Sequence, residues 1–243
     1  MPSSFTRTPR LYCEDDLPGP IALLPKQAHY LGTVMRLGPG DRFFVFNGRD
    51  GEFTAVLEGT GKRLRAKADG SDRVRAQTAR PSLTLAFAPL KQARLDYMME
   101  KAAEMGAGNV VPVLTQHGQV RKLNAERVRA HMIEACEQCG ILSVPTISEP
   151  MALADFVGKL GENTLVMADE ALAGEPLDTL AALRAAPPPL TVLIGPEGGF
   201  ADGERALLAG RAVRVSLGPR VLRADTAAVA LLGLVEATHP SVA

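Results

Sequence analysis

Apolar residues recur at two different spacings in the two parts of the chain. In the first part, short apolar runs such as 42–46 and 52–58 are separated by turn-forming residues, with Asn47-Gly48 as the strongest turn signal. The apolar residues of 27–37 instead have the spacing of a short helix. Several short strands with a single helix predict a small β-barrel over residues 1–72.

From residue 73 onward, apolar strands alternate with stretches of helical periodicity. Strands are expected at 82–88, 110–114, 144–147, 164–168, 190–194 and 213–217. Helices are expected at 94–105, 124–140, 152–160, 176–186 and 227–237. Because strands and helices alternate, we predict an α/β fold for residues 73–243, with a mainly parallel sheet and helices on both faces.

The charges balance overall but are unevenly distributed. Residues 1–80 carry 13 Lys and Arg against 9 Asp and Glu, and the remainder carries 14 against 18. A basic, turn-rich stretch contains Lys62, Arg63, Arg65, Lys67, Arg73, Arg75 and Arg80. This stretch fits two interpretations, a track for an RNA backbone or an exposed strand and linker whose charges protect a sheet edge.

Three cysteines, Cys13, Cys136 and Cys139, include one C-x-x-C pair, without a second pair or histidines at zinc-finger spacing. We interpret them as reduced, partly buried thiols, and we expect no metal site. The N-terminal residues lack the apolar core of a signal peptide, and no run approaches the roughly 20 apolar residues that cross a bilayer. We therefore expect a cytoplasmic protein with no membrane segment.

Two of the expected strands end in glycine-containing loops. The first meets Gly195-Pro196-Glu197-Gly198-Gly199, and the second meets Gly218-Pro219, after which Asp225-Thr226 opens an apolar helix. Glycine lets a ligand approach the backbone closely, and open α/β sheets bind ligands at the carboxyl ends of their strands. Neither loop is a phosphate-binding motif. The pair therefore predicts a ligand site of another kind at this edge of the sheet.

The segments 194–200 (IGPEGGF) and 217–223 (LGPRVLR) resemble the two C-terminal motifs of the SPOUT methyltransferases, specifically those of the RsmE family. The resemblance extends over nearly the whole chain. It implies a PUA-like RNA-binding β-barrel, residues 1–72, followed by a SPOUT methyltransferase domain, residues 73–243, whose C-terminal segment forms a trefoil knot. The chain departs from the family's usual Thr-Glu at Ala224-Asp225.

The resemblance also implies the cofactor and the partners. The cofactor would be S-adenosyl-L-methionine, and the reaction would be methylation of N3 of a uridine in bacterial 16S ribosomal RNA, free or in the assembled small subunit. The residues implied for the cofactor, by the two loops and their apolar walls, are Leu193, Gly195, Gly198, Gly199, Leu217, Gly218, Val221 and Leu222. The residues implied for RNA binding are Arg7, Arg10 and Arg36, and the basic stretch adds Arg63 and Arg65 as candidates.

Uridine N3 carries a proton at neutral pH, so the reaction needs that proton removed and the resulting charge stabilised. Arg223, or else Arg220, is expected to supply the positive charge. Glu197 and Asp225 are the candidates to accept the proton. Either carboxylate could instead cap backbone N–H groups, and for Asp225 we favour that role at the start of the last helix.

The last expected helix bears on assembly, and the sequence leaves two alternative functions open. The last helix, 227–237, is apolar nearly all round and must be covered on more than one face, so by resemblance we expect a homodimer. One alternative function is a SPOUT methyltransferase that acts on another RNA, because the motifs indicate the cofactor better than the substrate. The other is a non-catalytic RNA-binding protein, which the intact 195–199 loop argues against.

Overall fold

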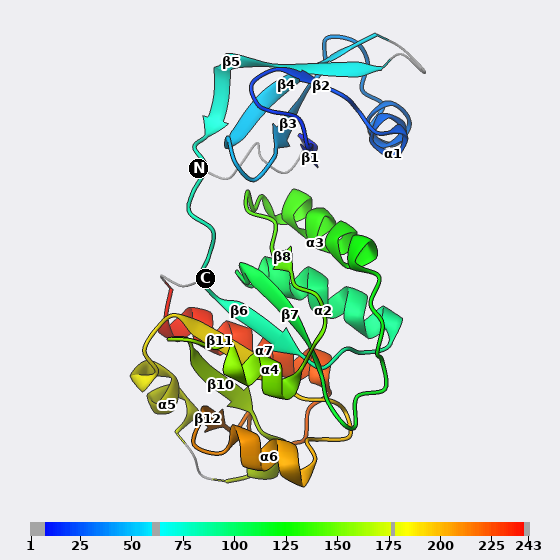
Figure 1. The fold of residues 1–243 in the computed structure, drawn as a ribbon. Coiled ribbons are helices and arrows are strands. Elements are labelled where there is room, and N and C mark those ends of the chain that lie inside the picture. Colours follow the sequence, from blue (N-terminus) through cyan, green and yellow to red (C-terminus); the bar gives the residue numbers. More distant parts are fainter. Residues whose placement is uncertain (1–7, 60–63, 176–177, 241–243) are drawn as a thin grey trace. The chain divides into compact units, whose positions relative to one another are not determined.

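The computed structural model describes residues 8–59, 64–175 and 178–240 (Figure 1). They form two compact units. The first contains the described residues up to Ala79 together with Cys136–Val144, and the second contains Arg80–Ala135 and the described residues from Pro145 onward. The boundary expected after residue 72 therefore falls inside a strand of the first unit, and a later segment of the chain also joins that unit.

The first unit is built on a five-stranded sheet with the order β1-β3-β4-β5-β2. β1 runs parallel to β3, and the other neighbours are antiparallel. The strands are β1 (Arg10–Tyr12), β2 (Pro20–Ile21), β3 (Arg42–Phe46), β4 (Glu52–Glu58) and β5 (Arg65–Arg75). Alternate side chains of β4, namely Phe53, Ala55 and Leu57, lie in the apolar core. The predicted strands at 42–46 and 52–58 are confirmed.

The expected helix at 27–37 is a short α-helix, α1 (Pro25–His29), continued by one turn of π-helix, η2 (Tyr30–Val34). Within the basic stretch, Arg65–Arg75 form the strand β5. The expectation that this stretch is rich in turns is therefore wrong for these residues. In β5, Ala66 and Ala68 are buried while Arg65 and Lys67 are exposed. This period of two is that of a strand with one buried face.

A buried carboxylate pairs with two arginines within the first unit. The Glu52 side chain is fully buried and forms ion pairs with Arg10 and Arg75. Burial alone would raise the pKa of Glu52, but the hydrogen bonds from Arg75 and Arg10 outweigh burial and lower that pKa. The Arg10 guanidinium also lies over the Phe44 ring, 5.6 Å from its centroid, and donates to the Glu137 carbonyl. Arg10 therefore links β4, β3 and the Glu137 backbone within this unit.

The second unit contains a parallel sheet, as the alternation of strands and helices predicts. Its order is β12-β10-β11-β6-β7-β8, and β9 pairs with β7. The strands are β6 (Thr84–Phe87), β7 (Asn109–Leu114), β8 (Thr146–Ile147), β9 (Met151–Ala152), β10 (Thr164–Ala168), β11 (Leu190–Ile194) and β12 (Ala212–Val215). The bounds predicted for β10 and β11 are confirmed.

Helices cover both faces of this sheet (Figure 1). α2 and α5 each pack against α7, and α7 also contacts β11. α4 packs with α6, and both bury apolar side chains in a cluster with Met167 and Leu193 of the sheet. The helices are α2 (Gln92–Glu104), α3 (Ala125–Cys139), α4 (Leu153–Gly158), α5 (Thr179–Ala185), α6 (Asp202–Leu208) and α7 (Ala224–Thr238). α6 was not predicted, because seven residues contain too few apolar positions to show a period.

Three neighbouring strands end at the same level of the sheet. In the register, Ala168 at the end of β10 lies opposite both Ile194 of β11 and Val215 of β12. The loops that follow these strands therefore meet at one carboxyl edge. The trefoil knot that the resemblance implies stays a prediction.

Candidate active site

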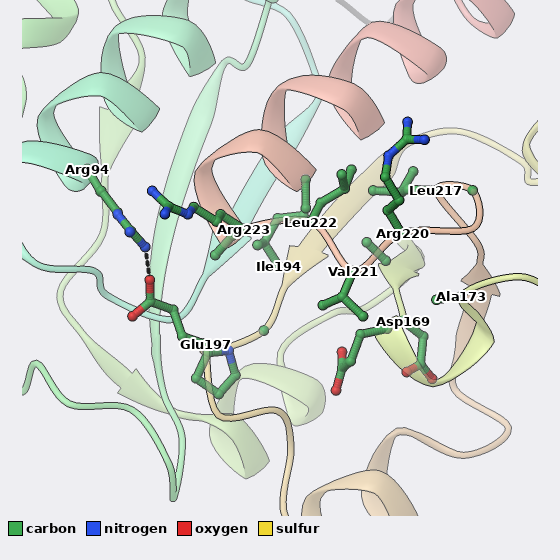
Figure 2. Close-up of a pocket in the computed structure, with 17 residues that line it drawn as sticks. Arg94, Asp169, Ala173, Ile194, Glu197, Leu217, Arg220, Val221, Leu222 and Arg223 are labelled. Carbon is green, nitrogen blue, oxygen red and sulfur yellow. Dashed lines mark hydrogen bonds and ion pairs between the residues drawn. The ribbon is translucent and has the colours of Figure 1, made fainter.

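The loops at this carboxyl edge surround a cleft of about 390 Å³ (Figure 2). Its floor and walls come from the ends of β10 and β11, the two glycine loops and the start of α7. The residues that line it are Arg94, Ala168, Asp169, Glu170, Ala173, Ile194, Gly195, Pro196, Glu197, Leu217, Gly218, Arg220, Val221, Leu222, Arg223, Ala224 and Ala227. The cleft thus brings together two segments, 194–197 and 217–224, that the sequence presented only as similar loops.

In the first loop, only Gly195 of the expected glycines lines the cleft. A Cβ atom at Gly195 would lie 2.7 Å from the buried Phe200 ring, so a glycine is required there for packing. Gly198 packs against His117, and Gly199 has a φ of +69° and packs against the Glu170 carboxylate. Leu193 is fully buried on the α4 and α6 side of the sheet. Gly198, Gly199 and Leu193 therefore do not line the cleft, and cofactor contact from them stays a prediction.

The second loop supplies apolar walls and two arginines. Leu217 and Leu222 are partly buried, whereas Val221 is 71% exposed at the mouth of the cleft. Gly218 has a φ of +104°, which favours glycine. Within the part of the chain that the structure describes, neither Arg220 nor Arg223 has an ion-pair partner. This loop therefore offers two uncompensated positive charges beside an apolar surface.

The first loop contributes a carboxylate that is already paired. Glu197 forms an ion pair with Arg94, which lies near the start of α2. In Figure 2 the Arg223 side chain extends toward this pair, whereas that of Arg220 extends away, beside Leu217. Arg94 was not predicted as a site residue, since its helical spacing marks only the polar side of an amphipathic helix. With Arg94 in place, this end of the cleft is net positive.

The loop after β10 forms the other end of the cleft. Asp169 is fully buried and accepts hydrogen bonds from Arg205, Arg214 and the Ala171 N–H. Burial alone would raise the pKa of Asp169, but these donors outweigh it and lower that pKa, so the carboxylate stays ionised. Neither Asp169 nor Glu170 was predicted as a site residue, because no sequence motif marks the loop after β10. Their ion pairs are with Arg205 and Arg214, which are distant in sequence.

Asp225 does not take the capping position expected for it. α7 begins at Ala224, and Arg223 occupies the extended N-cap position. Asp225 therefore lies in the first turn, where its carboxylate accepts a hydrogen bond from the Thr226 N–H at 2.9 Å. It is not among the residues that line the cleft. A carboxylate in the first turn interacts favourably with the positive end of the helix dipole. In this position it is not placed to take a proton from a ligand in the cleft.

The residues expected to bind RNA lie in different surroundings. Arg7 and Arg63 lie outside the described residues. Arg36, with a φ of +59°, and Arg65 on β5 are both exposed. The Arg10 side chain is only 9% exposed and is committed to Glu52, so a direct phosphate contact from Arg10 is not supported.

Several features bear on other classes of protein. Among the described residues, no helix is both long and apolar enough to cross a bilayer. In the same residues, no three His, Cys, Asp or Glu side chains gather as a metal ion would require. All three cysteines are reduced thiols, with Cys13 and Cys136 buried and Cys139 exposed. Burial raises the pKa of both Cys13 and Cys136 to about 12, so these two thiols are unreactive.

The fold and the cleft define an α/β enzyme domain joined to a strand-rich module, and comparison with known proteins gives the family. Residues 78–236 match the RNA methyltransferase domain, and residues 23–67 match the RNA methyltransferase PUA domain. Ribosomal RNA small subunit methyltransferase E of Rickettsia conorii is 34% identical over 213 residues, 85% of each chain. The chain therefore belongs to the RNA methyltransferase family, and within it to the group of ribosomal RNA small subunit methyltransferase E.

Two solved structures share this fold over nearly their whole length. A methyltransferase of Legionella pneumophila in complex with the cofactor SAM is 30% identical, with a TM-score of 0.80 over 95% of this chain and 97% of that one. Ribosomal RNA small subunit methyltransferase E of Neisseria gonorrhoeae, bound to S-adenosyl methionine, is 25% identical, with a TM-score of 0.79 over the same shares. Both parts of the predicted fold, the α/β methyltransferase domain and the PUA domain, are thus confirmed.

Proposed function

We propose that the protein methylates N3 of a uridine in 16S ribosomal RNA, using S-adenosyl-L-methionine. The observation that carries this proposal is the cleft at the carboxyl edge of the sheet. There, two arginines without ion-pair partners among the described residues border an apolar, glycine-lined pocket. The relatives named for small-subunit ribosomal RNA methylation, and the neighbours solved with SAM, support the same cofactor and the same substrate class.

The residues present fit an adenosine-containing cofactor. The cleft combines apolar side chains, namely Ile194, Leu217 and Leu222, with backbone groups at Gly195 and Gly218 that a ligand can approach closely. Its volume of about 390 Å³ lies in the range of small-molecule sites. S-Adenosyl-L-methionine, when bound there, supplies an electrophilic methyl group. The surrounding residues then hold it and orient the RNA base.

The arginine end of the cleft suits the chemistry of uridine N3. Loss of the N3 proton leaves a negative charge spread over the two ring carbonyl oxygens, and a fixed cation nearby lowers the free energy of that state. Arg223 extends toward the Arg94–Glu197 pair and is our choice for this role, with Arg220 as the second. Glu197 lines the cleft and is the candidate to accept the proton, and its carboxylate forms an ion pair with Arg94.

Assembly and substrate choice complete the proposal. α7 buries one face against its own domain, while Val229, Ala230, Gly233 and Leu234 stay partly exposed along another. We propose that a second copy of the chain covers this stripe in a homodimer, since an apolar helix needs cover on more than one side. Light scattering that reports a monomer at micromolar concentration contradicts the dimer. The small subunit, free or assembled, is proposed as the substrate from the names of the relatives. A cytoplasmic location is proposed because the proposed substrate is ribosomal RNA.

The test is methyl transfer from labelled S-adenosylmethionine by the purified protein. We expect labelling of 16S RNA or of small subunits from cells that lack this modification, and no labelling of 23S RNA. Nucleoside analysis should identify the product as 3-methyluridine. Methylation of a different RNA would favour the alternative enzyme of the same family, and cofactor binding without transfer to any RNA would favour a non-catalytic RNA-binding protein.

A further inference from the structure

The two ends of the cleft carry different charged side chains. Arg94, Arg223 and Glu197 gather at one end, and two carboxylates, Asp169 and Glu170, lie at the other. Val221 lies between Arg220 and Asp169 in Figure 2, so an apolar wall adjoins the acidic end. A ligand with hydrogen-bond donors beside a flat apolar part would meet acceptors at the carboxylate end, and its reacting part would face Arg94 and Arg223.

The two carboxylates differ in what remains available to a ligand. Asp169 is fully buried, and both of its oxygens accept hydrogen bonds from protein donors. Glu170 is 38% exposed, and its Oε1 accepts from Arg205 at 2.6 Å. Among the described residues, no donor reaches the other oxygen of Glu170. Of these two carboxylates, Glu170 is therefore the one with an oxygen left to accept a hydrogen bond from a ligand.

The loop that carries Glu170 is held in place from three sides. Arg205 of α6 binds both Asp169 and Glu170. The Gly174 N–H donates to the Gly218 carbonyl at 3.2 Å, which joins this loop to the second glycine loop. The Gly199 backbone lies so close to Glu170 that a Cβ atom at position 199 would lie 2.7 Å from Oε1 of Glu170. An acceptor fixed in this way binds a ligand with little further loss of side-chain entropy.

We propose that Glu170 is a specificity residue that accepts a hydrogen bond from the ribose hydroxyls of the cofactor. An ionised carboxylate is an acceptor only, and a vicinal diol offers donors close to the adenine that the apolar wall would hold. The ammonium group of the methionine part is the other donor on such a cofactor. It fits less well, because the ion pair with Arg205 already compensates the charge of Glu170. This inference rests on the proposed function.

The experiment uses ligands that separate the two donors. 5′-Methylthioadenosine has the ribose but no ammonium group, and its 2′,3′-dideoxy form lacks both hydroxyls. Titration calorimetry should show that the wild-type protein binds the dideoxy form about tenfold or more weakly, the size expected for a hydrogen bond to a charged group. Glu170→Ala should bring the ratio of the two affinities close to one. Glu170→Gln, which keeps a neutral acceptor, should give an intermediate ratio.

Glu175→Ala is the matched control, since Glu175 is an exposed carboxylate of the same loop that does not line the cleft. It should leave both affinities unchanged. A purely structural role for Glu170 would weaken both ligands equally and leave the ratio at its wild-type value, which overturns the inference. Equal binding of both ligands by the wild type also overturns it. A variant that weakens S-adenosylhomocysteine but not methylthioadenosine assigns Glu170 to the ammonium group instead, which overturns it as well. If the wild type binds none of these ligands, the proposed function itself fails.

Discussion

Gly199 offers a direct test of how the first glycine loop is built. Its φ of +69° costs an L-amino acid roughly 1–2 kcal/mol. A Cβ atom there would also lie 2.7 Å from Oε1 of Glu170 and would push the carboxylate away from Arg205. That ion pair is partly exposed and contributes at most about 1 kcal/mol. We therefore expect Gly199→Ala to lower the free energy of unfolding by about 1–3 kcal/mol, or Tm by roughly 2–12 °C.

Two other glycines provide matched controls in the same unit. Gly210 has a φ of +71°, and no atom lies within 4 Å of the place that a Cβ atom would take, so Gly210→Ala should cost only the backbone strain, about 1–2 kcal/mol. Gly203 lies within α6, also in open space, and Gly203→Ala should stabilise by up to about 1 kcal/mol.

Thermal unfolding of the three variants, followed by circular dichroism, should show Gly203→Ala as the most stable, Gly210→Ala as intermediate and Gly199→Ala as the least stable. Calorimetric titration with S-adenosylhomocysteine should then show weaker binding for Gly199→Ala alone, because only that substitution displaces a residue of the cleft. If Gly199→Ala costs no more than Gly210→Ala and binds the ligand as tightly as the wild type does, the contact between Gly199 and Glu170 does not shape the cleft.

Three further predictions concern the arginines, the buried carboxylates and the thiols. Arg223→Ala should lower the single-turnover methylation rate by about 10²–10³ with both substrates saturating, and a near-normal rate would remove Arg223 from the reaction. Glu52 and Asp169 have lowered pKa values when folded, so the stability they contribute is present above about pH 5 and is lost as the pH falls. Glu52→Gln should cost about 3 kcal/mol at pH 7 and flatten the acid side of the unfolding profile, and an unchanged profile would contradict the ion-pair assignment. Iodoacetamide should modify Cys139 in the native protein, whereas Cys13 and Cys136 should react only after unfolding, as peptide mass mapping can show.

Periodicity and turn signals predicted the parts of the fold that depend on local sequence. The two glycine loops, and the strands that lead into them, could be recognised because apolar runs stop abruptly at Gly195 and Gly218. Their shared position at strand ends predicted a ligand site at this edge of the sheet, whereas its cofactor was implied by the family resemblance. What local sequence does not contain is the register that brings Ala168, Ile194 and Val215 to one level and so joins a third loop to the cleft.

The predicted site residues that lie away from the cleft, or that are already paired, share a physical explanation. Glycines at 198 and 199 indicate close approach, and within the protein the groups beside them are His117 and Glu170. Leu193 faces the opposite side of the sheet from the cleft because side chains alternate along a strand. The arginine on β1 was predicted to face RNA, yet it neutralises Glu52, a partner 42 residues away that no local pattern reveals.

Methylation of uridine N3 in small-subunit RNA can be tested in cells. The most direct measurement is mass spectrometry of 16S RNA nucleosides from a bacterial strain that lacks its own small-subunit uridine-N3 methyltransferase and expresses this protein. We expect 3-methyluridine to return at one position with the wild type and to be strongly reduced with Arg223→Ala at equal protein level. Absence of 3-methyluridine with well-folded wild-type protein, or equal amounts with both proteins, would contradict the function proposed for this cleft.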